Sequence, residues 1–321
     1  MKATEIKKIA CIGSGVIGAS WATNFIMKGY PVNVYDIKQE QLELAKSNID
    51  NNLKFLFEEK ILTAEEVEKA KSLVNYTTSM KEAVSDVQFI QESGPERYEI
   101  KHAILDELEK YTSPETIYAS STSGLLITEI AKNAKHPERC IGAHPYNPPH
   151  LIPLVELSKG EKSSEEAVKT ASDFFKLLGK EPITLQKEAL GFISNRLQVA
   201  LYREVIELVM RGVCTVEDID KAVCFGPGLR YGTMGPNLIF QLGGGPHGIK
   251  GIMKHIGPSV ELWLNDMASW TKVPEEWADI AHEGVVEEMA NREPEFGQNN
   301  EDLTKFRDRM LIDLLKLHKK L

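Results

Sequence analysis

A glycine-rich segment near the N-terminus constrains the fold more than any other feature of the chain. The apolar run Ile9–Ile12 leads into Gly13-Ser14-Gly15-Val16-Ile17-Gly18, and a helical pattern follows. This is G-x-G-x-x-G between a strand and a helix. The first glycine permits a tight turn, the second lets a phosphate approach the backbone, and the third lets helix and strand pack closely. The segment therefore predicts a dinucleotide-binding turn.

An acidic residue indicates which dinucleotide binds there. Asp36 follows the next predicted strand, 18 residues after Gly18. A carboxylate at this place accepts hydrogen bonds from the adenosine ribose hydroxyls and repels a 2′-phosphate. We therefore expect NAD in preference to NADP, although Lys38 could soften the repulsion. The residues expected to contact the cofactor in this region are Gly13, Gly15, Val16, Ile17, Gly18 and Asp36.

The first part of the chain alternates short apolar runs with amphipathic segments, which predicts a mostly parallel sheet covered by helices. After the second strand, Gln39–Leu73 is expected to be a helical insertion that breaks at Leu62, with Thr63 as the next N-cap. The expected strands are Ile9–Ile12, Val32–Tyr35, Val87–Gln91, Thr116–Ala119 and Cys140–Ala143.

Strand signals vanish beyond about residue 188, where helical periodicity such as Phe192–Met210 takes over. The fold class is therefore α/β: a Rossmann-type doubly wound sheet with a helical insertion, followed by an all-α domain. We expect the NAD-binding domain to span residues 1–187. Residues 188–321 are expected to form the helical domain that contributes to the substrate cleft and to dimerisation.

Charge and cysteine content exclude several classes of protein. The formal net charge is −9, and nucleic acids and anionic membranes attract basic surfaces. The four cysteines form no pair at zinc spacing, so we expect no metal site and buried, reduced thiols. No run of 18 apolar residues predicts a membrane span. These features favour a cytoplasmic protein that acts on a small molecule.

Reactive side chains follow two of the later strands. Ser120–Gly124 comes directly after one predicted strand, and His144–Pro149 lies at the end of another. Ligands of open α/β sheets bind at the carboxyl ends of the strands. Glu156, in the apolar run Leu151–Leu157, could orient His144 as a base. A purely structural histidine is the equal alternative from these residues alone.

These segments resemble the L-3-hydroxyacyl-CoA dehydrogenase superfamily over nearly the whole chain. The spacing of twelve between His144 and Glu156 is that of the family's histidine and glutamate. The resemblance implies oxidation of a 3-hydroxy group to a ketone with NAD as the oxidant. It is carried by Gly13–Gly18 with Asp36, Ala119–Leu125, His144–Pro148, Leu154–Leu157 and Gly191–Arg196.

The resemblance also implies a role for each matching residue. His144 would be the general base, and Glu156 would orient it. Ser123 and Asn195 would donate hydrogen bonds to the reacting oxygen of the substrate. Residues implied to lie around the nicotinamide and its ribose are Glu96, Lys101, Ser123 and Asn147.

Within the superfamily, the chain is similar to the branch of L-carnitine dehydrogenases and L-gulonate 3-dehydrogenases (lambda-crystallins). These enzymes act on small free 3-hydroxy acids. Asn195 stands where the carnitine enzymes tend to carry an acidic residue, so the substrate stays open. A short-chain 3-hydroxyacyl-CoA dehydrogenase is one alternative. An NAD-binding structural protein of the lambda-crystallin type is another, against which the four catalytic residues argue.

Three features of the second domain bear on substrate and assembly. Arg230 lies in the glycine-rich segment Gly226–Gly232, where a guanidinium could grip a free carboxylate bidentately. An internal salt bridge or a helix cap is the equal alternative.

The resemblance implies a homodimer formed through this domain. The aromatic residues Phe240, Trp263, Trp270 and Trp277 could surround a trimethylammonium group, but core packing is the favoured interpretation.

Overall fold

The computed structural model describes residues 1–321. By its contacts the chain divides into two units, residues 1–196 with 311–321, and residues 197–310. The sequence alone places the domain boundary at residue 187, and the contacts divide the chain a few residues later. The C-terminal segment belongs to the first unit because Ile312 and Leu315 pack on Leu56 and Leu151.

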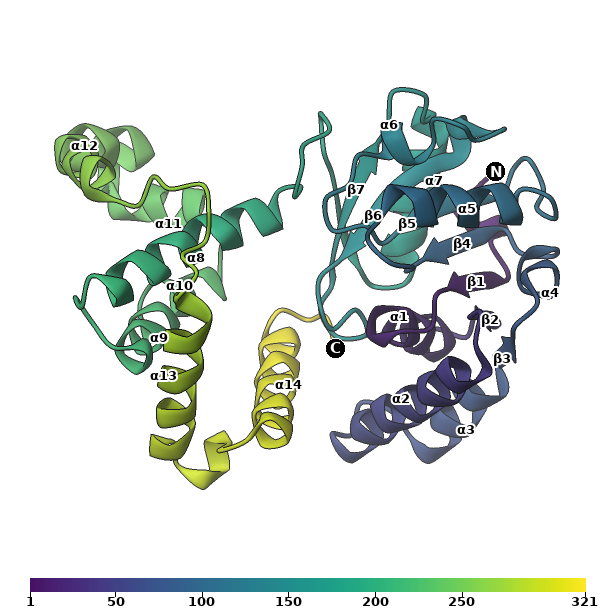
Figure 1. Cartoon of the computed structure of the whole chain (residues 1–321), viewed down its shortest axis with the longest axis horizontal. Helices are drawn as coiled ribbons and strands as arrows, with labels where there is room; N and C mark the ends of the chain where they lie inside the picture. Colours follow the sequence, from purple (N-terminus) through teal and green to yellow (C-terminus); the bar gives the residue numbers. More distant parts are fainter. The chain divides into compact units, whose positions relative to one another are not determined.

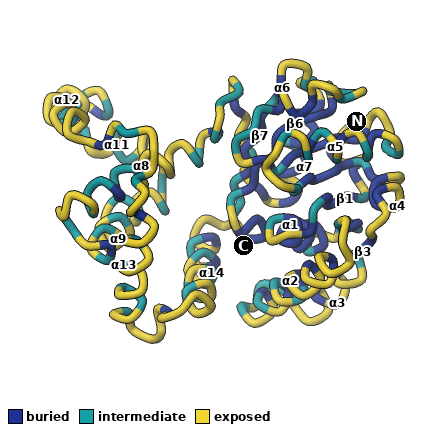
Figure 2. The backbone as a smooth tube through the Cα atoms, in the orientation of Figure 1, coloured by how far each residue is buried: buried dark blue, intermediate teal, exposed yellow.

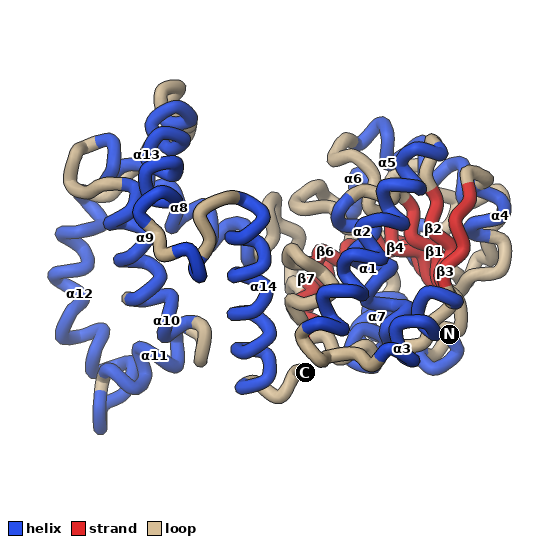
Figure 3. Tube along the Cα trace, turned by 90° about the horizontal axis from the view of Figure 1, so that it is seen from below, coloured by secondary structure: helices blue, strands red, loops and turns tan.

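The first unit is built on one eight-stranded sheet with the order β3-β2-β1-β4-β5-β6-β7-β8. Strands of this sheet are red in Figure 3. Neighbouring strands from β3 to β6 are parallel, β7 is antiparallel to β6, and β8 is parallel to β7. The predicted mostly parallel sheet is confirmed. The strands are β1 Ile9–Ile12, β2 Val32–Tyr35, β3 Val74–Thr77, β4 Phe89–Glu92, β5 Ile117–Ser120, β6 Cys140–Pro145, β7 Leu154–Lys159 and β8 Glu181–Thr184.

All five strands expected from apolar runs are present, within two residues of the predicted bounds. β3 and β8 were not expected. They are the two edges of the sheet, and their side chains are largely exposed or half-buried. Edge strands face solvent on one side, so they lack the continuous apolar run that reveals a central strand.

Helices cover both faces of this sheet (Figure 1). Alternate residues of β1 show the division, since Ile9 and Cys11 join one apolar cluster and Ala10 and Ile12 join the other. The first cluster lies under α1, α2, α3 and α7, and the second under α4, α5 and α6. The helices are α1 Val16–Met27, α2 Gln39–Glu58, α3 Ala64–Ser72, α4 Met80–Val84, α5 Tyr98–Leu108, α6 Ile127–Ile130 and α7 Glu165–Leu177.

The predicted break in the helical insertion is confirmed. α2 ends at Glu58, and Thr63 is the N-cap of α3. The Thr63 hydroxyl accepts a hydrogen bond from the Glu66 amide at 3.2 Å, and the Glu66 carboxylate accepts one from the Thr63 amide at 2.8 Å. This reciprocal capping box fixes the start of α3.

The second unit is helical and contains no strand. α8 begins in the first unit, and α14 ends there. None of its helices, nor any other helix of the chain, is both long and apolar enough to cross a membrane. The helices are α8 Ser194–Met210, α9 Val216–Phe225, α10 Pro227–Tyr231, α11 Pro236–Gly243, α12 Gly248–Asp266, α13 Trp277–Asn291 and α14 Asn300–Leu317.

Burial differs strongly between the two units (Figure 2). The central strands of the sheet are buried throughout, whereas few residues of the second unit are. Large apolar side chains of the second unit stay exposed, among them Phe225 at 74%, Leu262 at 71% and Leu242 at 67%. This unit therefore presents many large apolar side chains at its surface.

Three features of the second unit bear on the expectations from the sequence. The glycine-rich segment Gly226–Gly232 contains the short helix α10, which begins at Pro227, since proline suits a first helical position. The expectation of buried cysteines is wrong for Cys224, which is exposed, and for Cys214, which is half-buried. The indole of Trp277 is buried and donates to the Tyr202 hydroxyl at 3.0 Å, as core packing predicts, but Trp263 is 60% exposed, so the expectation of core packing is wrong there.

Candidate active site

The glycine turn after β1 is shaped by close packing on one side and open space on the other. A Cβ on Gly13 would lie 2.7 Å from the carbonyl oxygen of Ser93, and one on Gly18 would lie 1.9 Å from that of Gly13. Nothing lies within 4 Å of a Cβ built on Gly15. The free amides of the first turn of α1 and the space at Gly15 suit a phosphate.

Asp36 is held beside this turn. Its Oδ2 accepts hydrogen bonds from the amide and the hydroxyl of Ser14, at 2.9 and 2.8 Å, which leaves Oδ1 for a ribose hydroxyl. Ile37, an apolar residue directly after Asp36, is 74% exposed and offers a surface for an adenine ring. Sequence reasoning missed Ser14 and Ile37. The residues of this region fit the adenosine diphosphate half of NAD.

His144 and Glu156 face each other across the antiparallel pair β6 and β7. The imidazole Nδ1 lies 2.7 Å from Glu156 Oε2, so Nδ1 carries the hydrogen and Nε2 is left for another partner. His144 is 6% exposed and Glu156 is fully buried. The spacing of twelve residues therefore has a structural cause, since the strand register places the two residues opposite each other.

Glu156 accepts further hydrogen bonds from the start of α8. The amides of Ile193 and Ser194 donate to Oε1, both at 2.9 Å, and the Ser194 hydroxyl donates to Oε2. Burial alone would raise the pKa of this carboxyl. The bonds from His144 and Ser194 outweigh burial and lower its pKa to about 2. Glu156 is thus a carboxylate that also fixes the first turn of α8.

Asn195 and Ser123 meet at the end of this network. Asn195 Nδ2 donates to the carbonyl oxygen of Ser123 at 2.8 Å. The two segments touch so closely that a Cβ on Gly124 would lie 2.7 Å from the amide nitrogen of Gly191. The structure therefore brings all four predicted residues of the constellation together, because Glu156 holds both His144 and the helix start that bears Asn195.

Glu96 orders the turn that carries Ser123. Its Oε1 accepts hydrogen bonds from the Thr122 hydroxyl at 2.6 Å and from the Ser123 amide at 2.7 Å. One carboxylate therefore fixes both Thr122 and Ser123 in the segment Ser120–Gly124. Glu96 remains partly exposed, with 42% of its side-chain surface accessible.

Lys101 is enclosed beneath Glu96. Its ammonium lies 3.0 Å from both carboxylate oxygens of Glu92 and 3.7 Å from Glu96 Oε2. Glu92 is fully buried and also accepts from the hydroxyls of Tyr118 and Ser120, at 3.0 and 2.6 Å. Sequence reasoning missed Glu92, although it ends a buried strand. Contact of Lys101 with the cofactor ribose remains a prediction.

The turn after β6 is tied to the cofactor-binding helix. It begins at Asn147, which is exposed, and the Ser20 hydroxyl of α1 lies 2.7 Å from His150 Nδ1. Lys180 is buried and donates to the carbonyl oxygen of Ile152 at 3.0 Å. Burial lowers the pKa of the Lys180 ammonium to about 7. His150 and Lys180 thus support the segment that bears Asn147, and nothing in the sequence alone indicated that Lys180 does so.

Sequence comparison identifies the family. The model of the 3-hydroxyacyl-CoA dehydrogenase NAD binding domain matches residues 8–189, and that of the C-terminal domain matches residues 191–279. This chain belongs to the 3-hydroxyacyl-CoA dehydrogenase family. It is an NAD-dependent dehydrogenase, as the resemblance in its motifs predicted.

Two known dehydrogenases match over nearly the whole chain, and a third matches over part of it. L-carnitine dehydrogenase of Streptomyces griseus is 38% identical over 97% of this chain and 90% of its own length. The crystal structure of the NAD⁺-dependent 5-formyl-3-hydroxy-2-methylpyridine 4-carboxylic acid 5-dehydrogenase has a TM-score of 0.78 at 28% identity, covering 98% of each chain. Escherichia coli 3-hydroxybutyryl-CoA dehydrogenase has a TM-score of 0.66 at 32% identity, covering 74% of this chain and 49% of its own.

Arg230 lies in the second unit of the dehydrogenase, within the short helix α10. Its side chain is exposed, and the residue's carbonyl oxygen accepts a hydrogen bond from the Thr233 hydroxyl at 2.7 Å. An internal salt bridge, the alternative from the sequence, is not formed within this unit. Its part in binding a carboxylate remains a prediction.

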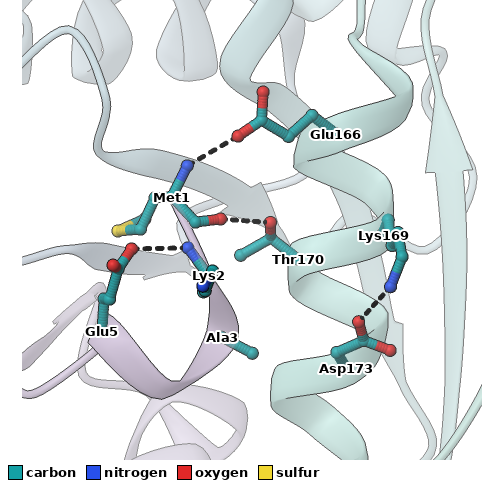
Figure 4. Close-up of a pocket in the computed structure, with 8 residues that line it drawn as sticks. All are labelled: Met1, Lys2, Ala3, Glu5, Glu166, Lys169, Thr170 and Asp173. Carbon is teal, nitrogen blue, oxygen red and sulfur yellow. Dashed lines mark hydrogen bonds and ion pairs between the residues drawn. The ribbon is translucent and has the colours of Figure 1, made fainter.

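A separate hollow of the dehydrogenase lies between the N-terminal segment and α7 (Figure 4). Four of its charged groups form two ion pairs. The terminal ammonium of Met1 lies 2.6 Å from Glu166 Oε1, and Lys169 Nζ lies 2.6 Å from Asp173 Oδ2. No residue of the cofactor turn or of the histidine–glutamate pair lines this hollow. No group of three or more His, Cys, Asp or Glu side chains in the chain is arranged to hold a metal ion.

Proposed function

We propose that this dehydrogenase oxidises a small free L-3-hydroxy acid, of the carnitine or gulonate kind, to the 3-keto acid. His144 is the general base. The observation that carries the proposal is the buried hydrogen bond between His144 Nδ1 and Glu156 Oε2, with Ser123 and Asn195 beside it. A histidine that is oriented by a carboxylate and keeps Nε2 free is the arrangement that proton abstraction from a hydroxyl requires.

The residues divide the work of the reaction. His144 Nε2 takes the proton of the substrate hydroxyl, and Glu156 holds the tautomer and stabilises the imidazolium that forms. Bound NAD would supply the acceptor for the hydride that leaves C3. Asn195 Nδ2 donates one hydrogen to the Ser123 carbonyl oxygen and has a second available for the reacting oxygen of the substrate. The Ser123 hydroxyl also donates to that oxygen. The same groups serve the reverse reduction.

The cofactor site involves both the glycine turn and the Ser123 region. Gly13, Gly15, Val16, Ile17 and Gly18 hold the pyrophosphate, and Asp36 holds the adenosine ribose. The groups proposed to lie around the nicotinamide and its ribose are Glu96, Lys101, Ser123 and Asn147. Glu96 supports this assignment, since it already holds the Ser123 amide.

Two observations favour a free acid over a CoA thioester. L-carnitine dehydrogenases align with this chain over almost its whole length. The structural neighbour with a TM-score of 0.78 acts on a molecule whose name includes a free carboxylic acid. We propose that Arg230 binds the substrate carboxylate. The similarity to 3-hydroxybutyryl-CoA dehydrogenase keeps a short acyl-CoA as the second candidate.

The protein is proposed to act in the cytoplasm as a homodimer. The exposed apolar side chains of the second unit, such as Phe225, Leu242 and Leu262, support self-association through that unit. Light scattering after gel filtration measures the mass directly. A mass of one chain at micromolar concentration would contradict the dimer.

The test of the function is a substrate panel read as NADH absorbance. The purified protein is assayed with NAD and L-carnitine, L-gulonate or 3-hydroxybutyryl-CoA at matched concentrations. We expect the highest kcat/KM with one of the two free acids. A clear preference for the CoA thioester would overturn the proposed substrate class, and turnover of none would support an NAD-binding structural protein.

A further inference from the structure

Ser194 makes a contact that the proposed reaction does not itself require. It directly precedes Asn195, and its hydroxyl donates to Glu156 Oε2. This is the same oxygen that accepts the Nδ1 hydrogen of His144 at 2.7 Å. The other oxygen, Oε1, already accepts the amides of Ile193 and Ser194. His144 therefore shares its carboxylate with three other donors, one of them on the same atom.

The Ser194 hydroxyl is not needed to hold the helix. The first turn of α8 is fixed through Oε1 by two amide hydrogen bonds that any residue at position 194 could make. The buried ring of Phe192 packs edge-on against the imidazole of His144, with 5.6 Å between centroids. An alanine at position 194 would keep the two amide hydrogen bonds and the Phe192 ring contact, and would remove only the hydroxyl.

A hydrogen bond to a carboxylate competes with the stabilisation that this carboxylate gives to a neighbouring cation. Donors stabilise the negative charge and so reduce the basicity of the carboxylate, which is seen here in the lowered pKa of Glu156. A less basic partner holds the protonated imidazole less strongly. The basicity of His144 therefore depends on how many donors Glu156 accepts.

We propose that Ser194 is a positioning residue that tunes His144: its hydroxyl weakens the bond between Glu156 and the imidazole, so that His144 stays neutral and ready to accept a proton at a lower pH. This inference rests on the proposed role of His144 as the base. The other titratable side chain at the pair is Tyr146, whose ring lies 6.5 Å from that of His144. Burial and the charge of Glu156 raise the pKa of the Tyr146 phenol, so it does not titrate in the same range.

The test is the pH profile of kcat/KM for oxidation, measured for the wild-type protein, Ser194→Ala and Ser194→Thr. Because the base must be neutral, activity rises with pH as His144 loses its proton. We expect the midpoint of this rise to move to higher pH by about 0.5 to 1 in Ser194→Ala, the scale on which one hydrogen bond alters a carboxylate pair. At pH values below the rise, kcat/KM should then fall roughly three- to ten-fold. Above it, Ser194→Ala should match or exceed the wild type.

Ser194→Thr is the matched control, because it restores the hydroxyl and should restore the midpoint. Ser194→Cys, with a weaker donor, should fall between the two. Titration of the His144 ring by NMR in the protein without substrate, assigned by the signal missing in His144→Asn, gives a second readout independent of turnover. Equal loss of activity at every pH, or an unchanged ring titration in Ser194→Ala, would overturn the inference.

The outcomes also distinguish failure of this inference from failure of the proposed function. If His144→Asn keeps wild-type turnover, His144 is not the base and the proposed function fails. If His144→Asn is inactive but the midpoint of Ser194→Ala stays in place, the base is correct and only the role of Ser194 is wrong.

Discussion

Removing the charge of Lys101 tests the buried network beneath the Ser123 turn. In Lys101→Met the hydrocarbon stem is kept and the ammonium is lost. Glu92, which is fully buried, would then face the interior without its cation. Removing one partner of a buried ion pair costs about 3–5 kcal/mol, because the remaining charge is left uncompensated.

The lower end of that range is expected here. Glu92 keeps three other donors: the Gly94 amide at 2.6 Å and the hydroxyls of Tyr118 and Ser120. A loss of about 3 kcal/mol in the free energy of unfolding corresponds to a fall in Tm of about 6–12 °C for a domain of roughly 200 residues. Differential scanning calorimetry and urea unfolding measure both quantities.

Two control variants make the result specific. Lys110→Met removes an exposed ammonium that pairs with Glu107, and it should change stability by less than about 0.5 kcal/mol. The double variant Glu92→Gln/Lys101→Met removes both charges and should recover much of the loss, since the two residues are coupled. A Lys101→Met protein that melts within about 2 °C of the wild type would refute the reasoning.

Three further predictions follow from the cofactor, substrate and base sites. Asp36 should make kcat/KM higher with NAD than with NADP, and faster turnover with NADP at equal concentration would contradict its role. Arg230→Met should cost roughly 2–5 kcal/mol in kcat/KM for the free acid while folding and NAD affinity stay intact; earlier melting with equal loss on all substrates would indicate a structural role. The pKa of Glu156 is lowered from 4.5 to about 2, so the stability it contributes is present above about pH 4.5 and is lost as pH falls toward 2. Acid unfolding of Glu156→Gln should lack this component, and identical acid profiles for variant and wild type would refute it.

Much of the site was predictable because it depends on local patterns. The glycine turn needs particular residues at fixed positions, whereas the pairing of His144 with Glu156 was implied by the family resemblance and is explained by the strand register of the structure. The sequence could not reveal contacts that arise only when distant elements meet. Glu92 on β4 and Lys101 on α5 become partners inside the fold, and Ser194 meets Glu156 only because α8 begins there.

The C-terminal helix illustrates the same limit. The sequence predicted a helical second domain but not the surface that would bury its last helix. In the structure Ile312 and Leu315 pack on Leu56 and Leu151, so the last residues belong to the first unit. The edge strands β3 and β8 were missed for a different reason, since half-exposed strands lack an apolar run.

The proposed role of His144 is the centre of this account, and His144→Asn tests it most directly. Asparagine keeps a polar side chain of similar reach but cannot accept the hydroxyl proton at neutral pH. We predict that kcat for oxidation of the preferred substrate falls at least ~100-fold, the scale of general base catalysis. NAD affinity, measured by calorimetric titration, should stay at the wild-type value because His144 acts on the substrate. Turnover of His144→Asn close to that of the wild type would contradict the account.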